Sequence, residues 1–208
     1  MLTRTRTIIA CAAALAFGWG GTAALATTAT TWTITPGGSV TGTAGTTKVQ
    51  DTTTGTTLVC ASSATAATLK AGSGQTNPLG KITSVTFSNC SGPAGFRPTM
   101  TSSASPTNPY LLDGAAATLN GVTKVRITNV MISISGQGCS ATLAGLTSTS
   151  PGKITGKFTN STGILKVTGG NLHIWNVTSG CLGIINNGDP AKPTGSYMIT
   201  PAQTITSP

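Results

Sequence analysis

The sequence offers few side chains that could perform chemistry. It contains one histidine, His173, three acidic residues, which are Asp51, Asp113 and Asp189, and no glutamate. A Ser-His-Asp hydrolase would have to use His173, and the G-x-S-x-G sequence that often surrounds such a nucleophile does not occur. A glycosidase would need two of the three aspartates as its carboxylate pair.

The three aspartates lie in sequences that are typical of turns. They occur as Gln50-Asp51-Thr52, Leu112-Asp113-Gly114 and Gly188-Asp189-Pro190. An aspartate next to Gly or Pro usually bonds to its own backbone in a turn. We therefore predict turn roles for all three, and we predict that the protein is not an enzyme and uses no cofactor.

One pair of side chains could bind a ligand. In the segment 172–177, Leu172 and Ile174 face one way if the segment is a strand, while His173 and Trp175 face the other. An exposed pair of this kind could stack on a sugar ring or another flat ligand. The alternative is that both faces of the strand are covered and Trp175 packs in the core.

Four cysteines follow the N-terminal segment, at Cys60, Cys90, Cys139 and Cys181. An even number in an exported chain indicates disulfides formed in an oxidising compartment. Their spacings do not match a C-x-x-C motif and a single histidine cannot complete a zinc site, so we predict no metal site. Of the three connectivities, we favour Cys60–Cys90 with Cys139–Cys181, which closes the two shortest non-overlapping loops.

The N-terminus has the pattern of a secretory signal peptide. Arg4 and Arg6 precede a short apolar run at 7–17, and Ala24-Leu25-Ala26 forms an A-x-A cleavage site. We predict that residues 1–26 are removed and that the secreted, extracellular chain begins at Thr27.

Lipid attachment is an alternative for the same segment, because Ile8-Ile9-Ala10-Cys11 loosely fits a lipoprotein motif. Cleavage before Cys11 would leave too short an apolar region after Arg6. No later apolar stretch approaches the ~18 residues of a membrane span, so we predict none.

Composition favours a single all-β domain at 27–208. Thr, Ser, Gly and Ala dominate and only 7% of residues are charged, so the residues that helix surfaces need are scarce. Without Arg4 and Arg6, ten basic residues stand against three aspartates, a formal net charge of +7. The basic residues are scattered singly, so we predict no nucleic-acid partner.

Short strand-like runs recur along the chain with turn residues between them. We predict an antiparallel β-sandwich or an open barrel with two disulfides and no long helix. The predicted strands are Trp32–Thr35, Thr56–Cys60, Ile82–Ser88, Arg97–Ser102, Val122–Ser135, Cys139–Leu143, Ile154–Thr159, Ile164–Val167, Leu172–Val177, Tyr197–Thr200 and Gln203–Thr206.

Two of these runs look alike. Ile82 is followed by Val85 and Phe87, and Ile127 is followed by Val130 and Ile132, so the apolar alternation slips by one residue in each run. Such a slip predicts a β-bulge. A cysteine follows each run, which is consistent with a two-fold internal similarity, although convergent strand chemistry explains short matches almost as well.

Several motifs together resemble a known group of proteins. They are TTWTITPGG, ITSVTFSNCSG, GCSATL, FTNSTGILKVTGGNLHIWNV and the closing ITPAQTITSP, which span most of the chain after residue 26. The chain resembles a family of Thr-, Gly- and Ala-rich secreted actinobacterial proteins of unknown function. The resemblance implies a β-rich exported product and no particular activity.

The sequence therefore indicates an exported, non-enzymatic module that binds an unknown extracellular ligand or cell-envelope material, or has a structural role at the cell surface. Two alternatives remain open. One is carbohydrate or small-ligand binding through an aromatic face around His173 and Trp175. The other is a secreted hydrolase, which would need His173 and an aspartate to meet in a cleft.

Overall fold

The computed structural model describes residues 30–208. The predicted signal peptide, the alternative lipidation site Cys11 and the predicted cleavage before Thr27 lie outside the described residues. The described chain contains only strands and two single-turn 3-10 helices, so its predicted all-β class without a long helix is confirmed. The elements are β1 (Trp32–Thr35), β2 (Gly38–Ala44), β3 (Thr47–Asp51), β4 (Thr57–Leu69), β5 (Gly72–Gln75), β6 (Gly80–Ser91), η1 (Pro93–Gly95), β7 (Thr99–Ser102), β8 (Tyr110–Gly114), β9 (Val122–Val130), β10 (Ile132–Gly136), β11 (Cys139–Ala144), β12 (Gly152–Thr159), β13 (Ile164–Gly170), β14 (Leu172–Trp175), η2 (Ser179–Cys181), β15 (Pro190–Thr200) and β16 (Thr204–Thr206).

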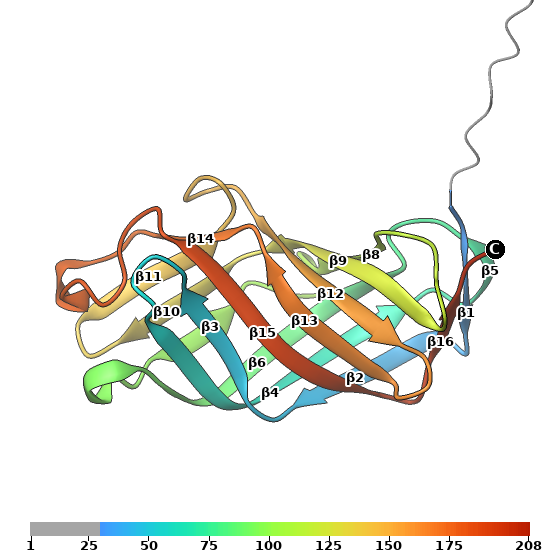
Figure 1. Ribbon diagram of the computed structural model, residues 1–208, viewed down its shortest axis with the longest axis horizontal. Helices are drawn as coiled ribbons and strands as arrows, with labels where there is room; N and C mark the ends of the chain where they lie inside the picture. Colours follow the sequence, from blue (N-terminus) through green and yellow to red (C-terminus); the bar gives the residue numbers. More distant parts are fainter. Residues whose placement is uncertain (1–29) are drawn as a thin grey trace, which may run out of the picture.

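The larger of two sheets closes on itself in chain order. Its eight wall positions are β2/β3, β4, β6, β7/β8, β9/β10, β11/β12, β13/β14 and β15, and β15 pairs back with β2 and β3. All of these pairings are antiparallel, which makes the sheet an elongated up-and-down barrel (Figure 1). The predicted antiparallel fold is confirmed, and opposite sides of one closed sheet face each other across the core as the two sheets of a sandwich would.

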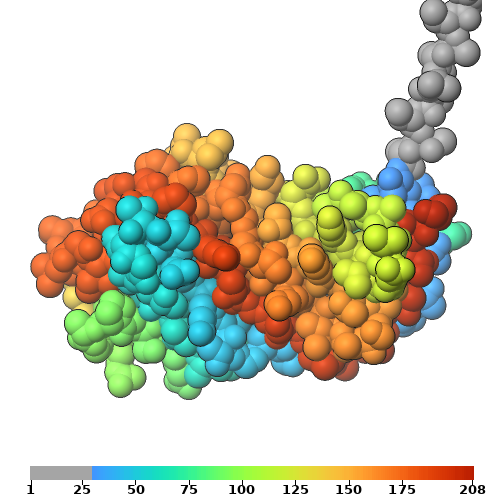
Figure 2. Space-filling model, viewed as in Figure 1, coloured from blue at the N-terminus to red at the C-terminus, as the bar shows by residue number. Residues whose placement is uncertain are grey.

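Each end of the barrel is covered by a different structure. At the right of Figure 1, the three-stranded sheet β16–β1–β5 covers one end and buries Trp32, Ile34 and Ile205. At the other end lies the segment 176–189, which includes η2. There the β3–β4 turn packs beside it, and the hydroxyl of Thr54 donates to the carbonyl of Ile184 at 3.3 Å (cyan and orange at the left of Figure 2).

Both predicted disulfides are present. Cys60 and Cys90 are direct partners in the β4–β6 ladder, and their bond links two strands that are already hydrogen-bonded. Cys139 and Cys181 link the start of β11 to η2 and so tie the segment 176–189 to the wall. The pairing of the shortest non-overlapping loops is therefore confirmed.

The two predicted β-bulges are also confirmed by the register of the strands. Opposite β4, Thr83 is the extra residue between Ile82 and Ser84. Opposite β12, two residues separate Ile127 from Val130 while only Lys153 separates their partners. Each bulge returns the next apolar side chains to the interior, which explains the slip in the apolar alternation.

Candidate functional site

The predicted binding pair lies on the outer surface of β14. Leu172 and Ile174 are buried in the interior, whereas His173 and Trp175 point outward and are half-buried. The centroids of the two outward rings are 6.3 Å apart and their planes are inclined by 34°. The predicted division of this strand into two faces is correct, and neither side chain is fully covered.

Two of the three ring nitrogens of this pair have protein partners. The indole N–H of Trp175 donates to the carbonyl of Gly145 at 3.0 Å, and Nδ1 of His173 lies 3.3 Å from the carbonyl oxygen of Asn171. Leu146, which follows Gly145, is 70% exposed. The two rings form a small aromatic patch on the outer surface. Neither ring lines the two cavities described below.

Two of the aspartates have the turn roles that the sequence predicts. Oδ1 of Asp51 accepts the backbone N–H groups of Thr53 and Thr54 at 2.9 and 3.0 Å, which closes the β3–β4 turn. Asp189 accepts a hydrogen bond of 3.2 Å from the side chain of Asn186. Both carboxylates therefore bond to residues of their own turns, Asp51 to backbone N–H groups and Asp189 to a side chain.

The turn prediction is wrong for Asp113, which lies within β8. There it faces Arg126 across the β8–β9 ladder, with 3.9 Å between Oδ2 and Nε. Burial raises the pKa of the Asp113 carboxyl above its ordinary value, and the nearby guanidinium acts in the opposite direction. Leu112-Asp113-Gly114 resembles a turn in sequence, but Leu112 and Gly114 both face the interior, as strand alternation requires.

Among the hydrogen bonds of residues 30–208, His173 contacts neither an aspartate nor a serine hydroxyl. In this part of the chain, three or more His, Cys, Asp or Glu side chains do not cluster in a way that could hold a metal ion. The helices of the described residues are too short and polar to cross a membrane.

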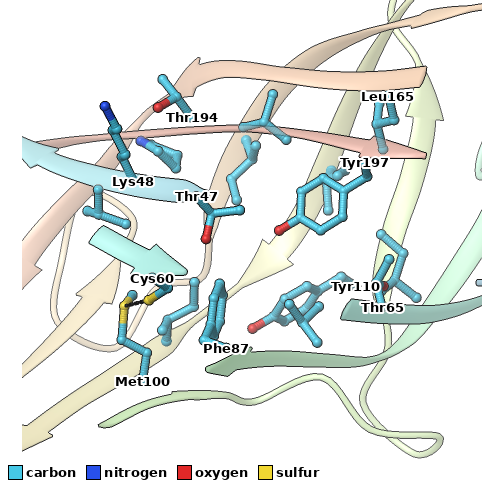
Figure 3. Close-up of a pocket in the computed structure, with 18 of the residues that line it drawn as sticks. Thr47, Lys48, Cys60, Thr65, Phe87, Met100, Tyr110, Leu165, Thr194 and Tyr197 are labelled. Carbon is cyan, nitrogen blue, oxygen red and sulfur yellow. Dashed lines mark hydrogen bonds between the residues drawn. The ribbon is translucent and has the colours of Figure 1, made fainter. Parts of the chain in front are cut away.

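The interior of the barrel is not completely filled by side chains. A cavity of about 80 Å³ is bordered by inward side chains from strands all around the wall (Figure 3). Its lining is almost entirely apolar and includes Leu58, Val85, Phe87, Met100, Ile154, Leu165 and Val167. A smaller cavity of about 40 Å³ shares Thr65, Ile82 and Leu165 with it, so the hollow continues along the barrel toward β16.

The hollow exists because several inward positions carry small side chains. Gly195 of β15 does not add to this space, because a Cβ there would lie only 2.9 Å from Cγ2 of Thr47 and 3.5 Å from Cε2 of Tyr197. Thr65 and Ala67 occupy inward positions of β4 where larger residues would fill the space. An eight-stranded barrel has an interior that side chains can just fill, so small residues leave room for a ligand.

Five side chains that border this otherwise apolar space carry a hydroxyl group, namely Thr47, Thr65, Tyr110, Thr194 and Tyr197. The hydroxyl of Tyr110 donates to the carbonyl of Met131 and accepts from Ser102 at 2.7 Å, so its hydrogen-bonding capacity is used. Burial raises the pKa of the Tyr197 phenol, and a phenol holds its proton at neutral pH even at its ordinary pKa. Oγ1 of Thr47 is buried and has no hydrogen-bond partner in the protein.

None of these residues is predicted from the sequence to bind a ligand. Tyr197 begins a predicted strand, and its alternation with Ile199 is the one pattern that indicates an inward aromatic side chain. Thr47 lies in a run of threonines and glycines with no apolar alternation, so the sequence carries no signal that distinguishes it.

Fold and site together define a class of protein: a closed, up-and-down antiparallel barrel with an apolar interior cavity and covered ends. Comparisons of the chain with protein-family models, with curated proteins and with solved structures each give no match. The function must therefore be argued from the geometry of this molecule.

Proposed function

We propose that the protein is an exported, non-enzymatic binding protein that holds a small, largely apolar molecule inside its barrel. The observation that carries the proposal is the apolar cavity of about 80 Å³ enclosed by the closed wall. Barrels of eight strands can enclose one small ligand, and small-molecule sites are mostly apolar spaces with a few placed polar groups.

An unfilled cavity of this size also has an energetic cost. At roughly 24 cal/mol per Å³, the loss of packing corresponds to about 2 kcal/mol of stability. Larger side chains at inward positions such as Thr65 could recover part of this loss. Their absence supports a binding role, because sites that must accept a ligand are not packed for maximal stability.

Two disulfides support an oxidising, extracellular setting for this binding role. The resemblance of several motifs to secreted actinobacterial proteins points to the same location. The non-enzymatic part of the proposal is supported by the three aspartates, two of which hold turns while Asp113 faces Arg126.

We expect the exported protein to begin at Thr27, since Ala24-Leu25-Ala26 follows an apolar run and two arginines. Mass spectrometry of the intact secreted protein measures this directly. A chain that retains residues 1–26, or one that begins with a lipidated Cys11, would contradict the expectation.

We expect Val167→Phe to abolish ligand binding, because Val167 faces the cavity and the larger ring would occupy it. In the unsubstituted protein, 1-butanol and pentane should shift the backbone amide NMR signals of β4, β6 and β15 in a saturable way. The milder Val85→Leu also adds bulk to the lining and should weaken both probes.

Val59→Phe is the matched control, because Val59 lies on β4 but is absent from the cavity lining. It should leave binding of both probes unchanged. Saturable binding that survives both cavity-filling variants, or no binding of either probe to the unsubstituted protein, would remove the basis of the proposed function.

A second candidate function is binding of carbohydrate or other cell-envelope material through His173 and Trp175. The observation that favours it is the outward position of the two rings, 6.3 Å apart, on a surface that is otherwise rich in small polar residues. The interior site ranks first because the indole N–H of Trp175 and Nδ1 of His173 already have hydrogen-bond partners, whereas the buried hydroxyl of Thr47 has none.

A further inference from the structure

We infer that the molecule held in the cavity is neutral and carries a hydroxyl or similar hydrogen-bonding group at one end, which Thr47 and Tyr197 bind. The inference rests on the proposed function and adds to it the chemical class and the orientation of the ligand.

Thr47 has a buried hydroxyl group without a hydrogen-bond partner in the protein. Its side chain is 6% exposed and lines the cavity. Buried hydroxyl groups are usually hydrogen-bonded because an unpaired one is costly. Figure 3 shows this hydroxyl pointing into the cavity, on the same side as the phenol of Tyr197. It can therefore donate a hydrogen bond to a ligand.

The hydrogen bond between Tyr197 and Ser63 has a defined direction. The hydroxyl of Ser63 donates to the carbonyl of Thr86 at 2.8 Å, which uses its single proton. The contact of 3.0 Å between Ser63 and Tyr197 must then have the phenol as donor. The phenol oxygen keeps a free lone pair, so Tyr197 can accept a hydrogen bond from a ligand.

The hydroxyl groups of Thr47 and Tyr197 also lie close together. Gly195 lies between them in the sheet, and Cγ2 of Thr47 and Cε2 of Tyr197 both pack against it, so the hydroxyl groups of the two side chains border the same part of the cavity. A hydroxyl placed there could accept from Thr47 and donate to Tyr197. One ligand group would then satisfy both side chains.

The remaining lining defines the rest of the ligand. Phe87, Met100, Ile154 and Leu165 offer only apolar contacts, and the hydroxyl of Tyr110 is already saturated. The hollow continues past Leu165 into the smaller cavity, so an apolar tail has a place to extend. Lys48 also borders the cavity, but it occupies an exposed position of β3, and Figure 3 shows its ammonium group directed away from the hydroxyl groups of Thr47 and Tyr197. A charged ligand group beside these hydroxyls would therefore lose its hydration without a counter-ion, which favours a neutral ligand.

The test compares 1-butanol with pentane, which replaces the hydroxyl by a methyl group. The dissociation constants of both are measured by NMR titration of the unsubstituted protein and of Thr47→Val. Thr47→Val should weaken the binding of 1-butanol more than that of pentane. The dissociation constant of pentane divided by that of 1-butanol should therefore fall about tenfold, as expected for one lost hydrogen bond. Tyr197→Phe should lower the same ratio, and butanoate should bind more weakly than 1-butanol.

Thr123→Val is the matched control, because Thr123 is also a buried threonine but its hydroxyl bonds to Thr118 and Ile205 and does not line either cavity. It should leave the ratio unchanged. A ratio unaffected by Thr47→Val, or tighter binding of butanoate than of 1-butanol, would overturn the inference while leaving the proposed function intact. Absence of binding by both neutral probes would instead defeat the proposed function itself.

Discussion

The double variant Cys139→Ala/Cys181→Ala is expected to lose about 4 kcal/mol of unfolding free energy. The bond closes a loop of 42 residues, and the entropy that a cross-link removes from the unfolded chain corresponds to a stabilisation of this size. Urea denaturation of the oxidised protein measures the loss. Alanine is chosen because both positions are buried, and a serine hydroxyl there would add a cost of its own.

The same variant should also open the end of the barrel locally. The segment 176–189 contains only the single turn η2, and the disulfide is its one covalent tie to β11. Its amide hydrogens should exchange faster than those of the wall strands.

The matched control for both effects is Cys60→Ala/Cys90→Ala. That disulfide closes a shorter loop of 30 residues between paired strands, so the expected loss is about 3.5 kcal/mol without faster exchange in 176–189. A loss below about 1 kcal/mol in the Cys139 variant, or equal exchange in the two variants, would contradict this account of how the end is held.

Large inward side chains made part of the fold predictable from the sequence. The alternation of Leu172 and Ile174, and of Ile132 and Ile134, marks strands whose interior face is apolar, and these strands are present in the structure. The slip after Ile82 predicted a bulge because a one-residue change of phase has few other causes in a strand.

Strands with small inward residues were missed. β2 places Gly42 and Ala44 in the interior, and the second half of β4 places Ser63 and Thr65 there, so neither shows apolar alternation. Gly, Ala and Ser also have low strand propensity, and the same composition is typical of loops. Only pairing with neighbours on both sides makes these segments strands.

The first part of β15 was not predicted as a strand because it contains two prolines. Pro190 and Pro193 lie within β15, where a sequence reading expects a turn. At Pro193 the strand pairs with Val49 of β3, but its pairing on the other side is interrupted between Ala191 and Gly195. Proline is tolerated there because the strand has a hydrogen-bonded neighbour on one side only.

The candidate site was unpredictable for the same reason. His173 and Trp175 are conspicuous because they are rare side chains, yet they lie on the outer surface. The cavity forms where small residues of different strands meet, and only the register of the closed sheet brings Thr47 next to Gly195 and Tyr197. The residues that create a hollow are, in sequence, the least distinctive ones.

The second large effect is expected for Trp32→Ala, which should lose about 3–5 kcal/mol of unfolding free energy. Trp32 is 4% exposed, and its indole lies directly against Gly114 at the end of the barrel. The ring therefore fills the space between the covering sheet and the wall, and its removal would leave a cavity at their junction. Gly114→Ala should also destabilise the protein, because its methyl group would overlap the indole.

Trp175→Ala is the matched control, since it removes the same side chain from a half-buried outward position. It deletes one hydrogen bond, to Gly145, and part of an apolar contact, so its cost should be less than half that of Trp32→Ala. Urea denaturation of the two variants and of the unsubstituted protein measures both losses of unfolding free energy. Equal losses would mean that the sheet β16–β1–β5 is not part of the cooperatively folded core, and that the end of the barrel nearest the smaller cavity opens independently.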